Sequence, residues 1–250
     1  MPLVESESLV LKSYNLAEAD KIVVLLTREH GIVRGVAKGA KRLKSRFGSG
    51  LEPFSIVAAT YFEKETVELV SIQKVELLAS NFAAAADPAF LGKFSYLAEL
   101  LMAFSPPHDP NETLYRMTRA CIETAAADAG ALDAVGVYFE LWLLRLAGFL
   151  PDWRTCRDCG RVLSDSENAS VTGDQHLVCG NCRRTEGNQT LGSAARAIAA
   201  SVRTRHPEEF ARHCAGELTE LRALSGVLRE IATRSLGRKV TGEMQFAIQK

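Results

Sequence analysis

Short apolar and β-branched runs alternate with turn residues through the first eighty positions of the chain. Runs of this length, bounded by glycine and charged residues, are typical of β-strands. Glu29-His30-Gly31 is short enough to close a hairpin between the second and third runs. Five strands in so short a segment predict a small barrel, because closure removes the exposed sheet edges. The predicted strands cover residues 8–14, 21–28, 31–37, 54–62 and 66–75.

Helical spacing replaces the strand pattern after Phe82. Apolar side chains recur three and four positions apart in several segments, which is typical of helices with one buried face. Asn111 is placed to cap the second of these helices, and Gly148 follows the end of the third. The predicted helical segments are 90–104, 114–122, 135–146 and 217–236.

The two patterns together predict an α+β fold in which a five-stranded barrel precedes a helical domain. A polar, glycine-containing segment with four cysteines interrupts the helices and is predicted to be an insertion. The predicted domain ranges are 1–80 for the barrel, 81–151 for the first helical part, 152–190 for the insertion and 191–250 for the second helical part.

The cysteines of the insertion have the spacing of a metal site. Cys156 and Cys159 form one C-x2-C pair, Cys179 and Cys182 form a second, and nineteen residues separate the pairs. This spacing predicts one tetrahedral zinc ion with four protein ligands, which is a structural and not a catalytic site. An iron–sulfur cluster, two disulfides and a thioredoxin-like redox pair are the alternatives.

One histidine and the two remaining cysteines are predicted not to bind metal. His176 lies between the two pairs and is predicted to be a surface loop residue, since four cysteines already complete the ligand set. Cys121 and Cys214 fall in helical segments and are predicted to be small buried apolar residues.

Charge is balanced overall but concentrated locally. The 250 residues contain 30 Lys and Arg against 30 Asp and Glu, while residues 28–50 hold seven basic residues and only one acid, Glu29. Because electrostatic fields act over about 10 Å at cellular salt, a neutral protein with such a segment can bind a polyanion. Residues 38–53, here called the basic loop, lack apolar periodicity and are predicted to be a long flexible connection. Phe47 is its best candidate for stacking on a base, whereas Phe54 is predicted to be in the core.

Several function classes lack their sequence signals. No segment reaches the ~18 apolar residues of a membrane span, and the first residues do not resemble a signal peptide, so a cytoplasmic protein is expected. The chain contains no phosphate-binding glycine motif, no H-E-x-x-H and no nucleophile elbow. These observations favour a binding protein without catalytic residues.

Several runs of the sequence resemble the RecO family of bacterial DNA repair proteins. The resemblance covers nearly the whole chain in order, and it is strongest in residues 8–60 and 140–182. The runs are AEADKIV (17–23), LTREHG (26–31), RGVAKGAKR (34–42), LEPF (51–54), and RLAGFLP (145–151) leading into Cys156 and Cys159-Gly160.

The resemblance implies an N-terminal OB-fold, a helical domain and a zinc-binding insertion. RecO-like proteins are not enzymes: they bind single- and double-stranded DNA and anneal complementary strands. With RecR they help RecA replace the single-strand-binding protein (SSB), and they also bind the acidic, phenylalanine-tipped tail of SSB. A cytoplasmic protein that joins the nucleoid when bound to DNA is expected.

The resemblance and the charge pattern select the same candidate site residues. The predicted DNA contacts are Arg34, Lys38, Lys41, Arg42, Lys44 and Arg46. The predicted cationic residues for the SSB tail, or for a longer DNA surface, are Arg222, Arg229, Arg238 and Lys239.

Two other functions are compatible with a four-cysteine insertion. One is a zinc-ribbon enzyme such as a nucleotide transferase or an RNA-modifying protein, for which the sequence offers no phosphate-binding motif or clustered acid and base. The other is a protein-interaction adaptor that uses the zinc ribbon and makes no direct contact with DNA.

Overall fold

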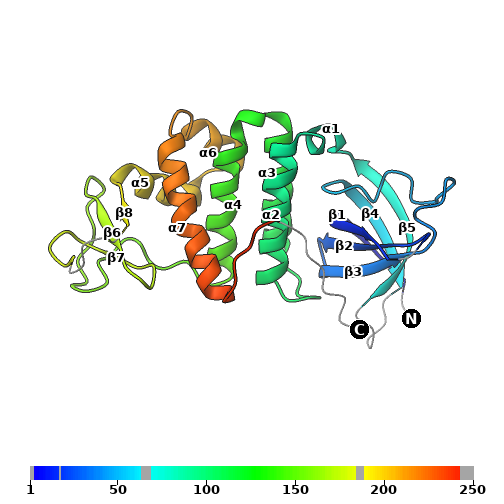
Figure 1. Ribbon diagram of the computed structural model, residues 1–250, viewed down its shortest axis with the longest axis horizontal. Helices are drawn as coiled ribbons and strands as arrows, with labels where there is room; N and C mark the ends of the chain where they lie inside the picture. Colours follow the sequence, from blue (N-terminus) through cyan, green and yellow to red (C-terminus); the bar gives the residue numbers. More distant parts are fainter. Residues whose placement is uncertain (1–2, 17, 63–68, 184–188, 243–250) are drawn as a thin grey trace. The chain divides into compact units, whose positions relative to one another are not determined.

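The computed structural model describes residues 3–16, 18–62, 69–183 and 189–242 (Figure 1). The predicted turn around Glu63–Glu65 and the predicted start of the fifth strand at Thr66 lie outside these residues. The chain divides into two compact units, which are described separately. Unit 1 comprises Met1–Ala127 and Thr241–Lys250, and unit 2 comprises Asp128–Val240. The domain ranges predicted from the sequence stay a prediction.

Unit 1 begins with the closed five-stranded barrel that the sequence predicted. The strand order is β1-β2-β3-β5-β4, with β3 and β5 parallel and the other pairs antiparallel (Figure 1). This topology confirms the predicted OB-fold. The strands are β1 (Leu3–Asn15), β2 (Lys21–Thr27), β3 (Gly31–Ala37), β4 (Ile56–Phe62) and β5 (Val70–Ala79).

Two strands differ in extent from the prediction for the same reason. β1 is longer because its first half pairs with β4, from Leu3↔Phe62 to Leu9↔Ile56, while its second half pairs with β2. β5 continues to Ala79, beyond the predicted end at Val75, because its pairing with β4 extends to Ile56↔Ala79. The first half of β1 thus depends on a strand far away in the sequence, whereas β4 and β5 are consecutive strands that extend together.

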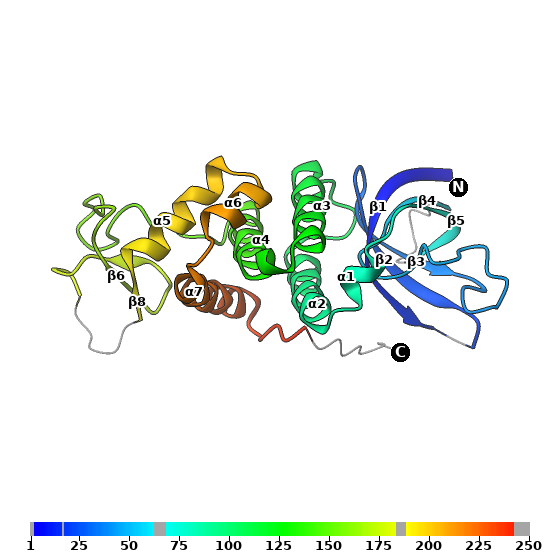
Figure 2. The same cartoon turned by 90° about the horizontal axis from the view of Figure 1, so that it is seen from above.

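Unit 1 also contains three helices. α1 (Phe82–Ala85), α2 (Pro88–Phe104) and α3 (Glu112–Ala127) follow the barrel, and α2 lies beside α3 (Figure 2). The predicted cap is confirmed, since the Leu114 amide donates to Asn111 Oδ1 at 2.9 Å. Phe54 is buried as predicted and packs against two phenylalanines of α2, Phe90 and Phe94.

The far end of the described chain also belongs to unit 1. The Gly242 amide donates to Glu99 Oε2 on α2 at 3.1 Å, and a Cβ atom at Gly242 would lie 3.2 Å from Tyr96. The whole of unit 2 is therefore inserted, in sequence, between α3 and this contact.

The β2–β3 hairpin ends at a glycine that has no room for a side chain. Gly31 has a φ of 66°, and a Cβ atom there would lie 2.2 Å from the carbonyl oxygen of Asp109. The Thr27 hydroxyl fixes the same turn by donating to the Gly31 carbonyl at 2.9 Å. Because the obstacle is backbone, it cannot move aside as a flexible side chain can.

We expect Gly31→Ala to lower the free energy of unfolding by about 2–4 kcal/mol, because left-handed strain and the clash add. Urea denaturation followed by circular dichroism measures this change. Gly92→Ala is the matched control, since Gly92 lies in α2 with nothing within 4 Å of an added Cβ atom. It should raise stability by about 0.5–1 kcal/mol. Equal effects of the two substitutions would contradict the assigned role of Gly31.

Unit 2 contains a helical part and a small sheet. α7 packs against α4 and α5, and the three short strands form a sheet of order β7-β6-β8. None of the helices in the described ranges is long and apolar enough to cross a membrane. The helices are α4 (Leu132–Leu146), α5 (Ser193–Ser201), α6 (Pro207–His213) and α7 (Leu218–Leu236), with 3₁₀ turns η1 (Ala129–Ala131) and η2 (Val202–Thr204); the strands are β6 (Ala169–Val171), β7 (Leu177–Val178) and β8 (Thr190–Leu191).

Candidate functional site

The basic loop is fastened to the barrel at several points, contrary to the prediction of a flexible connection. Phe47 and Leu51 are 3% and 2% exposed and pack into the barrel interior with Leu25 and Val57. Before them, the Lys41 amide donates to the Ala19 carbonyl at 2.9 Å. The prediction that Phe47 stacks on a base is therefore wrong, because this side chain fills the barrel core.

The predicted DNA-contacting side chains surround these anchors and point into solvent. All six are exposed, and within the described ranges no carboxylate forms an ion pair with Arg34, Lys38, Arg42 or Lys44. Arg46 lies over the Phe47 ring at 5.0 Å and donates to the Ile72 carbonyl at 3.3 Å. The basic loop thus presents a concentrated positive charge on a fixed backbone.

The register of the sheet adds a lysine that the sequence analysis did not select. Lys12 lies opposite Val24, which in turn lies opposite Arg34, so Lys12 and Arg34 share the outer face of the sheet. Lys12 is 4% exposed, and burial lowers its pKa to about 8, with the charge of Glu99 opposing the decrease and that of Arg34 adding to it. A pKa of 8 leaves Lys12 mostly protonated at neutral pH, so it adds to the field around Arg34.

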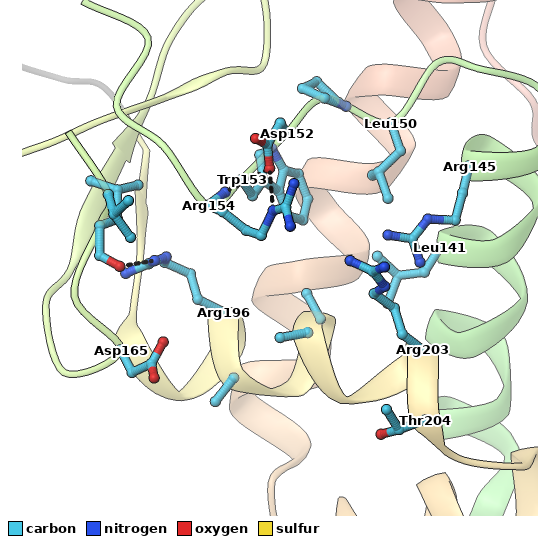
Figure 3. Close-up of a pocket in the computed structure, with 16 residues that line it drawn as sticks. Leu141, Arg145, Leu150, Asp152, Trp153, Arg154, Asp165, Arg196, Arg203 and Thr204 are labelled. Carbon is cyan, nitrogen blue, oxygen red and sulfur yellow. Dashed lines mark hydrogen bonds and ion pairs between the residues drawn. The ribbon is translucent and has the colours of Figure 1, made fainter. Parts of the chain in front are cut away.

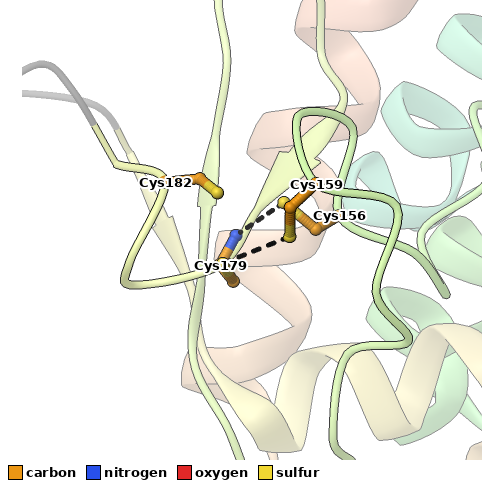
Figure 4. Close-up of side chains that lie close together, drawn as sticks. All are labelled: Cys156, Cys159, Cys179 and Cys182. Carbon is orange, nitrogen blue, oxygen red and sulfur yellow. Dashed lines mark hydrogen bonds between the residues drawn. The ribbon is translucent and has the colours of Figure 1, made fainter.

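The four cysteines of the insertion converge, as their spacing predicted (Figure 4). Their sulfur atoms all lie within 4.8 Å of one another, and those of Cys159 and Cys179 are 4.0 Å apart. Sulfurs at the corners of a zinc tetrahedron are about 3.8 Å apart, from Zn–S bonds of about 2.3 Å. Gly160, with a φ of 73°, completes the tight turn after the first pair. Donor type, number and spacing therefore fit a single tetrahedral metal ion.

Polar groups beside Cys179 favour its thiolate form. Arg161 binds Glu167 through two hydrogen bonds of 2.9 and 2.6 Å. Burial opposes ionisation of Cys179, but hydrogen bonds from Arg161 and Cys182 lower the pKa of the Cys179 thiol to about 6. His176 is not among the clustered ligands: its Nδ1 lies 3.6 Å from a carboxylate oxygen of Asp174, as expected for a loop residue.

The remaining two cysteines are confirmed as buried apolar residues. Cys121 is fully buried in α3, and Cys214 is 2% exposed after α6. Burial raises the pKa of the Cys214 thiol to about 11, so this thiol is protonated and inert.

A pocket of about 820 Å³ lies within unit 2, between α4, α5 and the start of the insertion (Figure 3). Its wall includes the apolar side chains of Leu141 and Leu150. Arg145 and Arg203 point toward one another beside Leu141, and Arg203 makes no ion pair or hydrogen bond within the described ranges. Burial lowers the pKa of Arg145, and the nearby charges of Arg203 and Arg154 lower it further. Like charges gathered beside an apolar wall suit a ligand that is both anionic and apolar.

The basic residues predicted to bind the SSB tail, on α7 and just after it, differ in their surroundings. Arg229 Nε lies 3.6 Å from a carboxylate oxygen of Glu140, which is 2% exposed in α4 and also accepts a hydrogen bond from Ser225 at 3.0 Å. Arg229 therefore compensates a buried charge between α4 and α7. Arg222 is exposed on α7, whereas Arg238 and Lys239 lie beyond its end at Gly237.

Sequence comparisons identify the family of the chain. Residues 1–81 match the family described as Recombination protein O N terminal, and residues 86–243 match Recombination protein O C terminal. The chain is 37% identical over 197 residues to a DNA repair protein RecO of Koribacter versatilis (strain Ellin345), covering 79% of each chain. It is 36% identical over 172 residues to that of Bifidobacterium adolescentis, covering 66% of this chain and 68% of the relative. A RecO of Anaeromyxobacter sp. (strain K) is 30% identical over 204 residues, covering 81% of this chain and 79% of the relative. These matches confirm the resemblance seen in the sequence motifs, and the chain belongs to the RecO family of DNA repair and recombination proteins.

Proposed function

We propose that this protein is a non-catalytic recombination mediator that binds single- and double-stranded DNA through the basic loop and Arg34. The observation that carries the proposal is a set of four exposed cations that have no carboxylate partner within the described ranges: Arg34, Lys38, Arg42 and Lys44. Such cations neutralise phosphates and release counterions, which favours binding to any DNA sequence. Cations on such a surface also screen the repulsion between the phosphates of two bound strands, which then anneal through their own base pairing.

The same surface supports the wider role proposed here. Together with RecR, the protein would help load RecA onto single strands coated with SSB. This step requires DNA contacts that form and break easily, and exposed ionic contacts meet that requirement because salt screens them.

Fluorescence anisotropy with a short single strand over a salt series tests the DNA-binding proposal. Six phosphate contacts predict a log–log slope of roughly −4, or about a 250-fold weaker affinity at 200 mM than at 50 mM salt. Weak binding without a salt slope would favour the alternative function of a zinc-ribbon adaptor that makes only protein contacts.

We further propose that the four cysteines hold one structural zinc ion. The ion would link the two C-x2-C turns, and four protein ligands leave no position for a reacting water. A four-iron cluster fits the sulfur spacing less well, because its own iron and sulfide atoms would hold the cysteine sulfurs farther apart.

For the acidic, phenylalanine-tipped tail of SSB, the pocket of unit 2 is a better site than the predicted residues of α7. The tail requires an apolar seat for the ring and cations for the acids. Leu141 and Leu150 offer an apolar surface for the phenylalanine ring, and Arg145 and Arg203 offer cations for the acidic groups. Arg222, Arg229, Arg238 and Lys239 stay a prediction, and Arg229 is already paired with Glu140.

Two matched single charge reversals separate these sites. Arg203→Glu should weaken binding of a fluorescent acidic peptide ending in phenylalanine by about 10- to 100-fold, the usual range for one charge-assisted hydrogen bond. Arg222→Glu, also at an exposed position, should leave the affinity unchanged within about threefold. The reverse pattern would place the tail on α7.

A further inference from the structure

The tip of the basic loop is a tight turn with a leucine near its apex. The Ser45 amide donates to the Arg42 carbonyl at 2.9 Å, which places Leu43 and Lys44 at the two central positions of a four-residue turn. Leu43 is 103% exposed, the largest value among the large apolar side chains of the described ranges; the next is Val162 at 73%.

An apolar side chain in this position has no role in the core. Glycine, proline, asparagine, aspartate and serine are the usual residues of tight turns, and each has a local conformational reason. Leucine has no such conformational reason to occupy a tight turn, and the exposure of its side chain to water is unfavourable. The basic loop contains three large apolar residues, of which Phe47 and Leu51 are buried in the barrel and only Leu43 is exposed.

The anchors of the basic loop keep Leu43 directed into solvent. The Lys41 amide is tied to the Ala19 carbonyl on one side of the turn, and Phe47 enters the barrel on the other. The immediate neighbours Arg42 and Lys44 are both exposed. The leucine therefore lies between cations that can bind successive phosphates of one strand.

We propose that Leu43 is an apolar wedge that enters a step between two adjacent bases of bound DNA. This inference rests on the proposed function, because the flanking cations must first hold the strand. Leucine is among the side chains that other DNA-binding proteins insert between bases, where it replaces part of the stacking contact. In this loop it would take the place of an aromatic platform, since Phe47 is buried.

The wedge gives the strand a conformation suited to pairing. Bases separated by Leu43 no longer stack on each other, and their pairing edges remain open because only their faces contact the leucine. The contact depends on base faces, which all four bases have, so it introduces no sequence preference.

A single strand containing 2-aminopurine tests the proposal, because stacking quenches the fluorescence of this base. Binding of the wild-type protein should increase the fluorescence severalfold. Leu43→Ser should remove most of this increase while lowering the affinity measured by anisotropy by no more than about tenfold. Its salt slope should equal that of the wild type, because the phosphate contacts are intact.

Two further variants serve as controls. Leu43→Met retains an apolar side chain and should retain the fluorescence increase, whereas Leu218→Ser changes an exposed leucine of unit 2 and should have no effect. An unchanged fluorescence increase in Leu43→Ser would overturn the wedge but leave the DNA-binding proposal standing. Salt-dependent binding of the wild type without any increase in 2-aminopurine fluorescence would likewise overturn the wedge and leave the DNA-binding proposal standing. If the wild type fails to bind the strand at all, the proposed function fails together with the wedge.

Discussion

Reversing three charges of the basic loop is expected to cause the largest loss of DNA affinity available from this surface. The variant Lys41→Glu, Arg42→Glu and Lys44→Glu removes three proposed phosphate contacts and adds three repulsive charges. The salt dependence should become weaker, with the log–log slope changing from roughly −4 to roughly −2. The affinity at low salt should fall by at least about 100-fold. Fluorescence anisotropy with a short single strand measures both quantities.

A control with the same change in net charge isolates the contribution of the basic loop. Arg116, Arg212 and Arg234 are exposed and lie on α3, α6 and α7. Reversing these three to glutamate should leave the slope near −4, with only a small uniform loss from long-range charge. If both triple variants lose the same affinity and slope, the DNA surface is not the basic loop.

Removing the metal proposed for the cysteine cluster is expected to unfold the insertion while the barrel remains folded. The sheet of the insertion consists of strands of three, two and two residues, too short to be stable alone. Structural zinc contributes apparent binding free energies of about 10–16 kcal/mol to small sites of this kind. Elemental analysis should find one zinc per chain, and hydrogen exchange after chelation should show lost protection in residues 152–183.

A ligand substitution and a matched cysteine control test the same point. Cys179→Ser should lower the metal content well below one ion per chain, because Cys179 is a buried member of the cluster. Cys121→Ala, in α3, should retain the full ion. Amides of β2 and β3 should stay protected in both proteins. Unchanged protection of the insertion after chelation would show that the metal does not stabilise it, and iron instead of zinc would refute the proposed identity.

Elements with a local signal were predicted well from the sequence. The helix predicted at 217–236 is observed as Leu218–Leu236, because its apolar spacing is continuous. Asn111 caps α3 because an asparagine side chain beside the first turn can accept a hydrogen bond from a backbone amide that has no partner within the helix. The cysteines converge because each C-x2-C turn directs two sulfurs to one point.

Features that depend on distant partners were not predictable in the same way. Phe47 and Leu51 lie in a polar, glycine-containing stretch without apolar periodicity, so nothing local shows that they fill the barrel. Arg145 and Arg203 face the same pocket only because η2 packs against α4. The pairing of Arg229 with Glu140 likewise depends on the packing of α4 against α7.

The contact between Gly242 and Glu99 has a consequence for the order of events during protein synthesis. All of unit 2 must be synthesised after α3 and before Gly242 is made. Translation through that stretch takes on the order of ten seconds. For this time the nascent barrel and its helices exist without their last partner. A stop codon anywhere in unit 2 would thus remove the final contact of unit 1 as well, although every strand of the barrel had been synthesised.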